Sequence, residues 1–319
     1  MRLLLWHVHG SWTTAFVQGQ HTYLLPTSGS RGPYGRGRAR TWDWPPSAVE
    51  VPIAQLRDQQ IDAVILQRPA EEDLTITLTG RRPGADLPAI YLEHNAPDRD
   101  VPLTRHPMAD RADLHLVHVT HFNELFWDCG RTPVTVIEHG IVDPGPLWTG
   151  ECPRVAVVVN EPLRRGRYAG TDLLPFFARD TPLDVFGMGV SNLPAELGTS
   201  AISAFDDLPQ AQMHAALARR RAYLHPFRWT SLGLSLIEAM HLGMPVLAFA
   251  VTEAVEAVPP GAGVLSTSKE QLRSRLRELM ADPAQAAEIG KRGREAALAR
   301  YGLARFLADW DRLLADVIR

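Results

Sequence analysis

The alternation of short apolar runs with helical patterns constrains the fold of this 319-residue chain more than any other feature. Several runs are continuous Val, Ile and Leu, which is typical of parallel strands covered by helices on both faces. We predict strands over residues 2–8, 63–67, 89–93, 114–119, 134–138, 154–159, 183–186, 222–224, 246–250 and 264–265, and helices over 208–219, 232–241, 269–280 and 283–300. This β-α-β rhythm predicts an α/β protein with two doubly wound, Rossmann-like domains.

The chain is long enough for two such domains, each with its own core. The run Asp143-Pro144-Gly145-Pro146 breaks the pattern, so we place the division there. We predict domains over 1–147 and 148–300, followed by an amphipathic helix over 301–319. Residues 29–40 are rich in Gly and Arg and are expected to form a mobile loop, either a solvated linker or a substrate gate.

Charge and cysteine content narrow the function classes. A formal net charge of −3 gives no global field that attracts nucleic acid, so an anion would need a local basic cluster. Cys129 and Cys152 lack a partner motif, which argues against a disulfide framework or a zinc site and fits a reducing cytoplasm. No apolar stretch of about 18 residues exists, so we expect a soluble protein. The scarcity of lysine beside arginine indicates a GC-rich bacterial genome.

The segment 224–248 has the pattern strand, turn, helix, turn, strand. Thr230 or Ser231 is predicted to cap the helix, and the N–H groups of Ser231, Leu232 and Gly233 are predicted to form an anion site at its start. Glu238 follows Ser231 by seven residues, about 10 Å along the axis, where a carboxylate can bind both hydroxyls of a ribose. The alternative is an ordinary packed helix with Glu238 paired to an arginine.

This segment resembles the donor-binding signature of the retaining GT-B glycosyltransferases of family 4. The signature has two glutamates separated by seven residues with a glycine between them, then Ala-Met and Gly-x-Pro-Val. The matching positions are Gly233, Glu238, Ala239, Met240, Gly243, Pro245 and Val246. Thr230 replaces the first glutamate, which in the family contacts hydroxyls of the donor sugar. The replacement implies a different donor sugar, another residue in that role, or lost catalysis.

Three arginines follow the predicted strand 154–159. Arg164, Arg165 and Arg167 surround a glycine ahead of a helix, a composition that suits a diphosphate and can stabilise charge on a leaving phosphate. The alternative is a solvated loop. The resemblance implies an Arg and a Lys at this turn, with Arg164 or Arg165 as the first and Arg167 as the second. Gly187 and Gly189 resemble the family's glycine turn beside the nucleotide base.

The N-terminal half of the chain carries a second set of candidate site residues. Gly10 and Ser11 follow the first strand, where an open α/β sheet places its ligand. The resemblance implies that this loop faces the donor phosphate and the acceptor, whereas Trp12 is expected to pack in the core. His94 ends a strand, and the resemblance implies contact with the donor sugar; the alternative is a local turn cap. His139 lies in a turn that resembles the family's Pro-Asn-Gly turn; we expect it to be structural, and the alternative is that it faces the acceptor.

The resemblance implies a GT-B fold, two facing Rossmann-like domains with a cleft. It also implies retaining transfer of a hexose from a nucleotide-diphosphate sugar to a hydroxyl of an unidentified acceptor. His94, Arg164 and Arg167 are the predicted catalytic residues. Because arginines and amides would neutralise the leaving phosphate, we expect no metal and no cofactor. Asp206 and Asp207 are expected to cap a helix rather than hold a cation. The alternatives are a catalytically silent nucleotide-sugar binder or partner subunit and a GT-B-type sugar-nucleotide epimerase; a nicotinamide-linked dehydrogenase lacks its third glycine.

Overall fold

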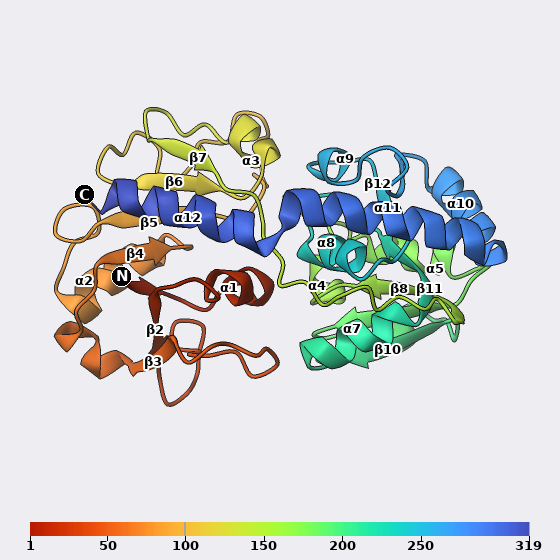
Figure 1. Cartoon of the computed structure of the whole chain (residues 1–319), viewed down its shortest axis with the longest axis horizontal. Helices are drawn as coiled ribbons and strands as arrows, with labels where there is room; N and C mark the ends of the chain where they lie inside the picture. Colours follow the sequence, from red (N-terminus) through yellow and green to blue (C-terminus); the bar gives the residue numbers. More distant parts are fainter. Residues whose placement is uncertain (99, 319) are drawn as a thin grey trace. The chain divides into compact units, whose positions relative to one another are not determined.

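The computed structural model describes residues 1–98 and 100–318, and it divides into two compact units (Figure 1). Unit 1 comprises Met1–Val142 and Leu303–Arg319, and unit 2 comprises Asp143–Gly302. Arg319, the last residue of the predicted C-terminal helix, lies outside the described residues. Each unit is therefore considered by itself.

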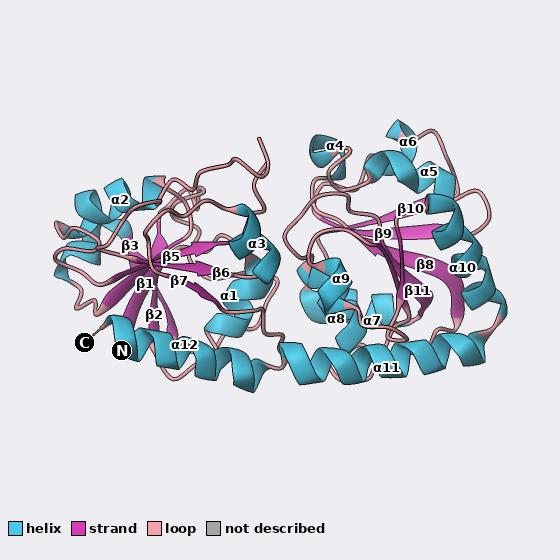
Figure 2. Ribbon diagram, turned by 90° about the horizontal axis from the view of Figure 1, so that it is seen from above, coloured by secondary structure: helices cyan, strands magenta, loops and turns pink. Residues whose placement is uncertain are grey.

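Unit 1 is built on one parallel sheet with the strand order β3-β2-β1-β4-β5-β6-β7. Its strands are β1 (Arg2–Leu5), β2 (Thr22–Thr27), β3 (Ala48–Pro52), β4 (Ala63–Leu66), β5 (Ala89–Glu93), β6 (His115–His118) and β7 (Val134–Val136). Its helices are α1 (Gly10–Phe16), η1 (Ile53–Asp58), α2 (Ala70–Thr79), α3 (His121–Phe126) and α12 (Leu303–Val317). Figure 2 shows α2 and α12 on opposite faces of this sheet. The strand order reverses between β1 and β4, and open α/β sheets bind ligands at such a point.

Unit 2 repeats this topology with the order β10-β9-β8-β11-β12-β13, again parallel throughout. Its strands are β8 (Cys152–Val158), β9 (Leu183–Gly187), β10 (Ile202–Asp206), β11 (Arg220–His225), β12 (Val246–Phe249) and β13 (Val264–Ser266). Its helices are α4 (Pro162–Arg165), η2 (Thr171–Leu173), α5 (Leu174–Phe177), α6 (Leu193–Glu196), α7 (Gln210–Ala218), α8 (Leu234–His241), α9 (Ala254–Ala257), α10 (Lys269–Ala281) and α11 (Pro283–Tyr301). The reversal falls between β8 and β11.

The central strands confirm the predicted α/β class. Leu3, Leu4 and Leu5 of β1 and all of β4 are fully buried, as strands covered on both faces must be. Separate apolar clusters form the cores of the two units. The prediction missed β2, β3 and β10. The outer strands β3 and β10 are only partly buried and therefore lack a continuous apolar run, and β2 contains a proline.

Helix α12 packs on α1 within unit 1. The ring of Trp310 lies 5.6 Å from that of Trp12 and 4.9 Å from that of Phe16, centroid to centroid. A Cβ added to Gly140 would lie 2.9 Å from Cδ1 of Phe306, so a side chain at this position would collide with the helix. The amphipathic pattern of the C-terminal segment thus corresponds to a helix with one buried face.

The arginine-rich segment 29–40 is fastened to β3. Arg31 donates two hydrogen bonds to Glu50, of 2.8 and 3.0 Å, and the backbone N–H of Arg38 donates a third of 2.8 Å. The guanidinium of Arg38 also donates to the carbonyl oxygen of Pro45. These hydrogen bonds hold the expected mobile loop against β3, and sequence reasoning did not connect the carboxylate of Glu50 with this loop.

Among the described residues, no helix is long and apolar enough to cross a membrane. Cys129 and Cys152 are both free thiols. Burial raises the pKa of the Cys129 thiol to about 11, so this thiol is not a reactive nucleophile.

Candidate functional site

The loops that follow β8 and β11 meet at the strand-order reversal of unit 2. The N–H groups of Arg228 and Trp229 both donate to the carbonyl oxygen of Tyr168, at 2.9 and 3.3 Å. Gly170 has a φ of +71°, and a Cβ there would collide with the carbonyl oxygen of Pro226. The contact therefore requires glycine at position 170. It joins the loop that carries Arg164, Arg165 and Arg167 to the segment that resembles the donor signature.

The predicted arginines differ in their surroundings. Arg164 and Arg167 are exposed, whereas Arg165 at the end of α4 is partly buried. The guanidinium carbon of Arg165 lies 5.0 Å from the centroid of the Phe227 ring, a cation–π contact. Burial, and then the charge of Arg164, lower the pKa of Arg165 from its usual value. The neighbouring positive charges of Arg164 and Arg165 therefore favour the binding of an anion beside them.

Arg228 joins this cluster, and sequence reasoning missed it. Its guanidinium donates two hydrogen bonds to Asp172, of 2.6 and 2.8 Å, and a third to the carbonyl oxygen of Arg167. Arg167 lies 3.2 Å from the same carboxylate. Arg228 first, and then Arg167, hold the pKa of Asp172 below its usual value. Arg228 stands directly after Phe227 in the sequence, but nothing local connects it with a loop some sixty residues earlier.

His225 stands at the carboxyl end of β11 behind this cluster. Its ring stacks on Phe227 with centroids 4.4 Å apart and an interplanar angle of 18°. Its Nδ1 lies 3.2 Å from the hydroxyl of Tyr223, which donates to Ser235 at 2.9 Å. Burial, and then Arg165, lower the pKa of His225 to about 3, so the imidazole is neutral.

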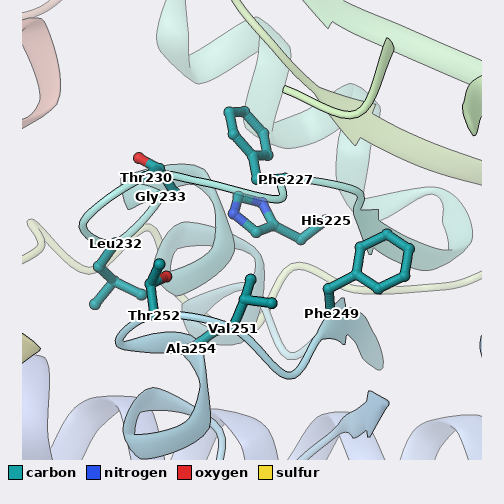
Figure 3. Close-up of a pocket in the computed structure, with 9 residues that line it drawn as sticks. All are labelled: His225, Phe227, Thr230, Leu232, Gly233, Phe249, Val251, Thr252 and Ala254. Atoms are coloured by element: carbon teal, nitrogen blue, oxygen red, sulfur yellow. The ribbon is translucent and has the colours of Figure 1, made fainter. Parts of the chain in front are cut away.

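Gly233 is needed for packing against His225. A Cβ at Gly233 would lie 2.6 Å from Nε2 of His225, although φ at this glycine is an ordinary −72°. Both residues line a shallow pocket, shown in Figure 3, with Phe227, Thr230 and Leu232. Gly233 therefore has a packing role in addition to the predicted role of its N–H group in binding an anion.

Helix α8 begins later than predicted. It starts at Leu234 with Gly233 as the N-cap, and among the described residues no side chain caps it. Ser231 and Leu232 are buried, at 3% and 6% exposure, and their N–H groups precede the helix. The prediction that Thr230 or Ser231 caps the helix is therefore wrong, whereas the anion site at Ser231–Gly233 stays a prediction. The amides at the helix start are those of Gly233, Leu234 and Ser235, and Leu234 lies about 6 Å before Glu238 along the axis.

Glu238 is buried, with 3% of its surface exposed, on the face of α8 that meets α7. Gln210 approaches one carboxylate oxygen at 3.4 Å, and Nε2 of His214 lies 3.7 Å from the other. Both distances exceed those of good hydrogen bonds. Two side chains of α7, a glutamine and a histidine, thus lie beside this carboxylate, and neither was foreseen.

The glycine turn after β9 packs against the loop after β8. Gly187 has a φ of +135°, and its Cβ would lie 2.8 Å from the carbonyl carbon of Val159. Gly189 has a φ of +72° and donates its N–H to Asp206 at 2.9 Å. Asp206 therefore orders the glycine turn, and Pro209 is the N-cap of α7. The prediction that Asp206-Asp207 caps that helix is wrong, because a nearer donor takes the carboxylate.

In unit 1, the loop after β1 leads into α1, which begins at Gly10. A Cβ at Gly10 would lie 3.2 Å from the indole ring of Trp42, and Ser11 is partly exposed. Trp12 is 1% exposed and belongs to the core, as expected.

His94 follows β5 and lies near the same loop. Its ring contacts that of His9 at a tilt of 43° with centroids 4.0 Å apart, and it forms an edge-to-face pair with Trp12 with centroids 5.4 Å apart. Burial first, and then His9 and His139, lower the pKa of His94 well below its usual value. Burial likewise lowers the pKa of His139 to about 3. The structure thus brings His94, Gly10 and Ser11 together at the carboxyl ends of β1 and β5.

Solved structures of other proteins share this architecture. The chain has a TM-score of 0.73 with sucrose-phosphate synthase from Thermosynechococcus elongatus, at 14% identity over 99% of this chain and 98% of that one. HepE from Anabaena in complex with UDP-glucose gives 0.71, at 13% identity over 99% and 100%. A glycosyltransferase from Rickettsia africae gives 0.69, at 13% identity over 100% and 98%. The fold is that of the GT-B proteins.

Part of unit 2 matches a known family in sequence. Residues 198–296, which include α7, β11 and α8, match the family model described as Glycosyl transferases group 1. The chain is therefore similar to glycosyl transferases group 1 over these residues, and it has the GT-B fold. A comparison with curated proteins found no match.

Proposed function

We propose that this protein is a glycosyltransferase that transfers a hexose from a nucleotide-diphosphate sugar to an acceptor hydroxyl, with retention of anomeric configuration and without a metal ion. The observation that carries the proposal is the convergence of Arg164, Arg165, Arg167 and Arg228 where β8 and β11 end. Asp172 is the carboxylate that pairs with two of them. The excess of positive charge at a strand-order reversal suits a diphosphate.

The arginines would act on the leaving group. As the glycosidic bond breaks, negative charge grows on the departing phosphate while the sugar becomes oxocarbenium-like. Arg165 and Arg167 would stabilise that charge, and the amides at Gly233–Ser235 would add to it. This is the basis for proposing that no metal is required. The cation–π contact with Phe227 orders Arg165 before the donor binds.

The nucleoside would lie beside α8 and the glycine turn. We propose that Glu238 binds the ribose hydroxyls, which requires the ribose to replace the long contact of Gln210. Gly187 and Gly189 would lie beside the base. The complex of HepE with UDP-glucose supports a nucleotide-sugar donor, since that protein shares this fold.

We propose that the sugar contacts His94 and that Gly10 and Ser11 lie near the phosphate. Thr230 takes the position of the family's first glutamate. The acceptor stays unassigned. A cytoplasmic location stays a prediction from the cysteine content. A silent sugar-nucleotide binder is the second candidate, because Thr230 cannot supply the carboxylate that it replaces.

The test combines binding and turnover. Calorimetry with UDP, GDP and dTDP should find one nucleotide whose affinity falls about tenfold or more in Arg165→Ala, whereas the matching nucleoside binds both proteins alike. Arg292→Ala, an exposed arginine of α11, is the matched control. Glu238→Ala should weaken nucleotide binding by about 1–3 kcal/mol.

A panel of the corresponding nucleotide sugars then separates the two candidates. Release of nucleotide that depends on an added acceptor supports transfer, and binding without turnover supports the silent binder. Equal nucleotide affinity in wild type and Arg165→Ala would contradict the proposed diphosphate site.

A further inference from the structure

Gln67 occupies the strand-order reversal of unit 1. It directly follows β4 and is 4% exposed. Its Nε2 donates a hydrogen bond of 2.8 Å to the carbonyl oxygen of Trp6, beyond the end of β1. Its Oε1 lies 3.0 Å from Nε2 of His94, which follows β5. One buried amide thus connects the ends of three neighbouring strands.

These two contacts determine which nitrogen of His94 carries the proton. A main-chain carbonyl oxygen accepts hydrogen bonds and cannot donate them, so the NH₂ group of Gln67 must face Trp6. The oxygen of the same amide therefore faces His94. Because that oxygen also only accepts, Nε2 of His94 must be the donor. In a neutral ring the lone pair then remains on Nδ1.

The surroundings of the ring keep it neutral. The ring of His9 contacts that of His94 at a tilt, and Trp12 forms an edge-to-face pair with His94. Burial is the main cause that disfavours the imidazolium form of His94. The charges that His9 and His139 carry when protonated disfavour it further. Gln67 itself is uncharged. The carboxylate of Glu71 is engaged by the backbone N–H of Gln67 at 2.6 Å and by Arg68.

We propose that Gln67 is a positioning residue that fixes His94 in the Nε2–H form, so that Nδ1 accepts a hydrogen bond from a hydroxyl of the bound sugar. The role in sugar binding rests on the proposed function, whereas the tautomer is a property of the free protein. His94 then serves as a neutral acceptor and does not donate a proton to the leaving group.

The first test needs no ligand. Long-range ¹H–¹⁵N spectra of the histidine rings, assigned by the signal lost in His94→Asn, report which nitrogen is protonated. We expect the Nε2–H form at neutral pH in the wild-type protein. An Nδ1–H form, or a mixture of both forms, would overturn the proposal whether or not the protein transfers sugar.

The second test replaces the amide. Gln67→Glu places a carboxylate beside Nε2–H, which favours the imidazolium and removes the lone pair of Nδ1. We expect kcat/KM for the sugar donor to fall about tenfold near neutral pH and to recover as pH rises, while affinity for the free nucleotide is unchanged. Gln55→Glu, at an exposed position of η1, is the matched control.

The outcomes separate the two proposals. A Gln67→Glu protein that folds and has the wild-type kcat/KM and pH profile would overturn the positioning role. If wild type shows the expected tautomer but no turnover with any donor and acceptor, the proposed function fails and the tautomer assignment stands.

Discussion

Replacement of Gly233 by alanine tests whether this glycine serves packing or ligand access. The added Cβ would lie 2.6 Å from Nε2 of His225, about 1 Å inside an ordinary contact. His225 is 3% exposed and stacks on Phe227, so its ring has little room to move. Overpacking of this kind costs about 1–3 kcal/mol. We therefore expect Gly233→Ala to lower the free energy of unfolding of unit 2 by that amount, measured by urea denaturation.

A double-mutant cycle identifies the cause. His225→Ala removes the obstructing ring, so Gly233→Ala in that background should be nearly neutral for stability. The coupling between the two substitutions should be about 1–3 kcal/mol. Gly29→Ala is the control, since a Cβ there meets no atom within 4 Å. Additive effects, or a Gly233→Ala protein as stable as wild type, would refute the packing explanation. Persistent loss of nucleotide affinity in the double variant would instead show that the ligand needs the glycine.

Three further outcomes are expected. Asp184→Ala should cost about 3–5 kcal/mol in urea unfolding, because the 1% exposed carboxylate pairs with Arg154 and Arg220 and its loss leaves both charges uncompensated; a loss below 1 kcal/mol would contradict this. Burial lowers the pKa of His118 to about 3, against about 6.5 in an unfolded chain, so only the unfolded state binds a proton between these values. The contribution of His118 to the free energy of unfolding is thus full above pH 6.5 and falls by about 1.4 kcal/mol per pH unit below it. Unfolding titrations from pH 7 to 5 should therefore show a shallower loss of stability in His118→Gln than in wild type. Glu50→Ala should speed tryptic cleavage of the loop after β2, and an unchanged rate would show that the three hydrogen bonds to Glu50 do not hold it.

The parts of the fold that sequence reasoning predicted are those with a local signal. The continuous apolar runs at β4 and β12 correspond to buried central strands. The outer strands β3 and β10 were missed because half-exposed strands have mixed composition. The start of α8 was placed too early because Thr230 and Ser231 are good capping residues in general, whereas here Gly233 takes that position.

The site was predicted less completely, because its contacts join loops distant in the sequence. The cluster Arg164–Arg167 has an obvious local composition, but Arg228 reaches it only because Gly170 lets the two loops approach. Gln67 gave no signal at all, since a lone glutamine after a strand is unremarkable until its two partners are known. His94 was identified through the resemblance, and the structure adds the groups that set its protonation.

The location of the diphosphate is the claim on which the account depends. A crystal structure of the full chain with the nucleoside diphosphate that binds best in calorimetry measures it directly. We expect the two phosphates within hydrogen-bond distance of Arg165 and of the amides at Gly233–Ser235, with the ribose against Glu238. Phosphates bound elsewhere, with Arg165 still stacked on Phe227 and Glu238 still covered by Gln210, would contradict the account.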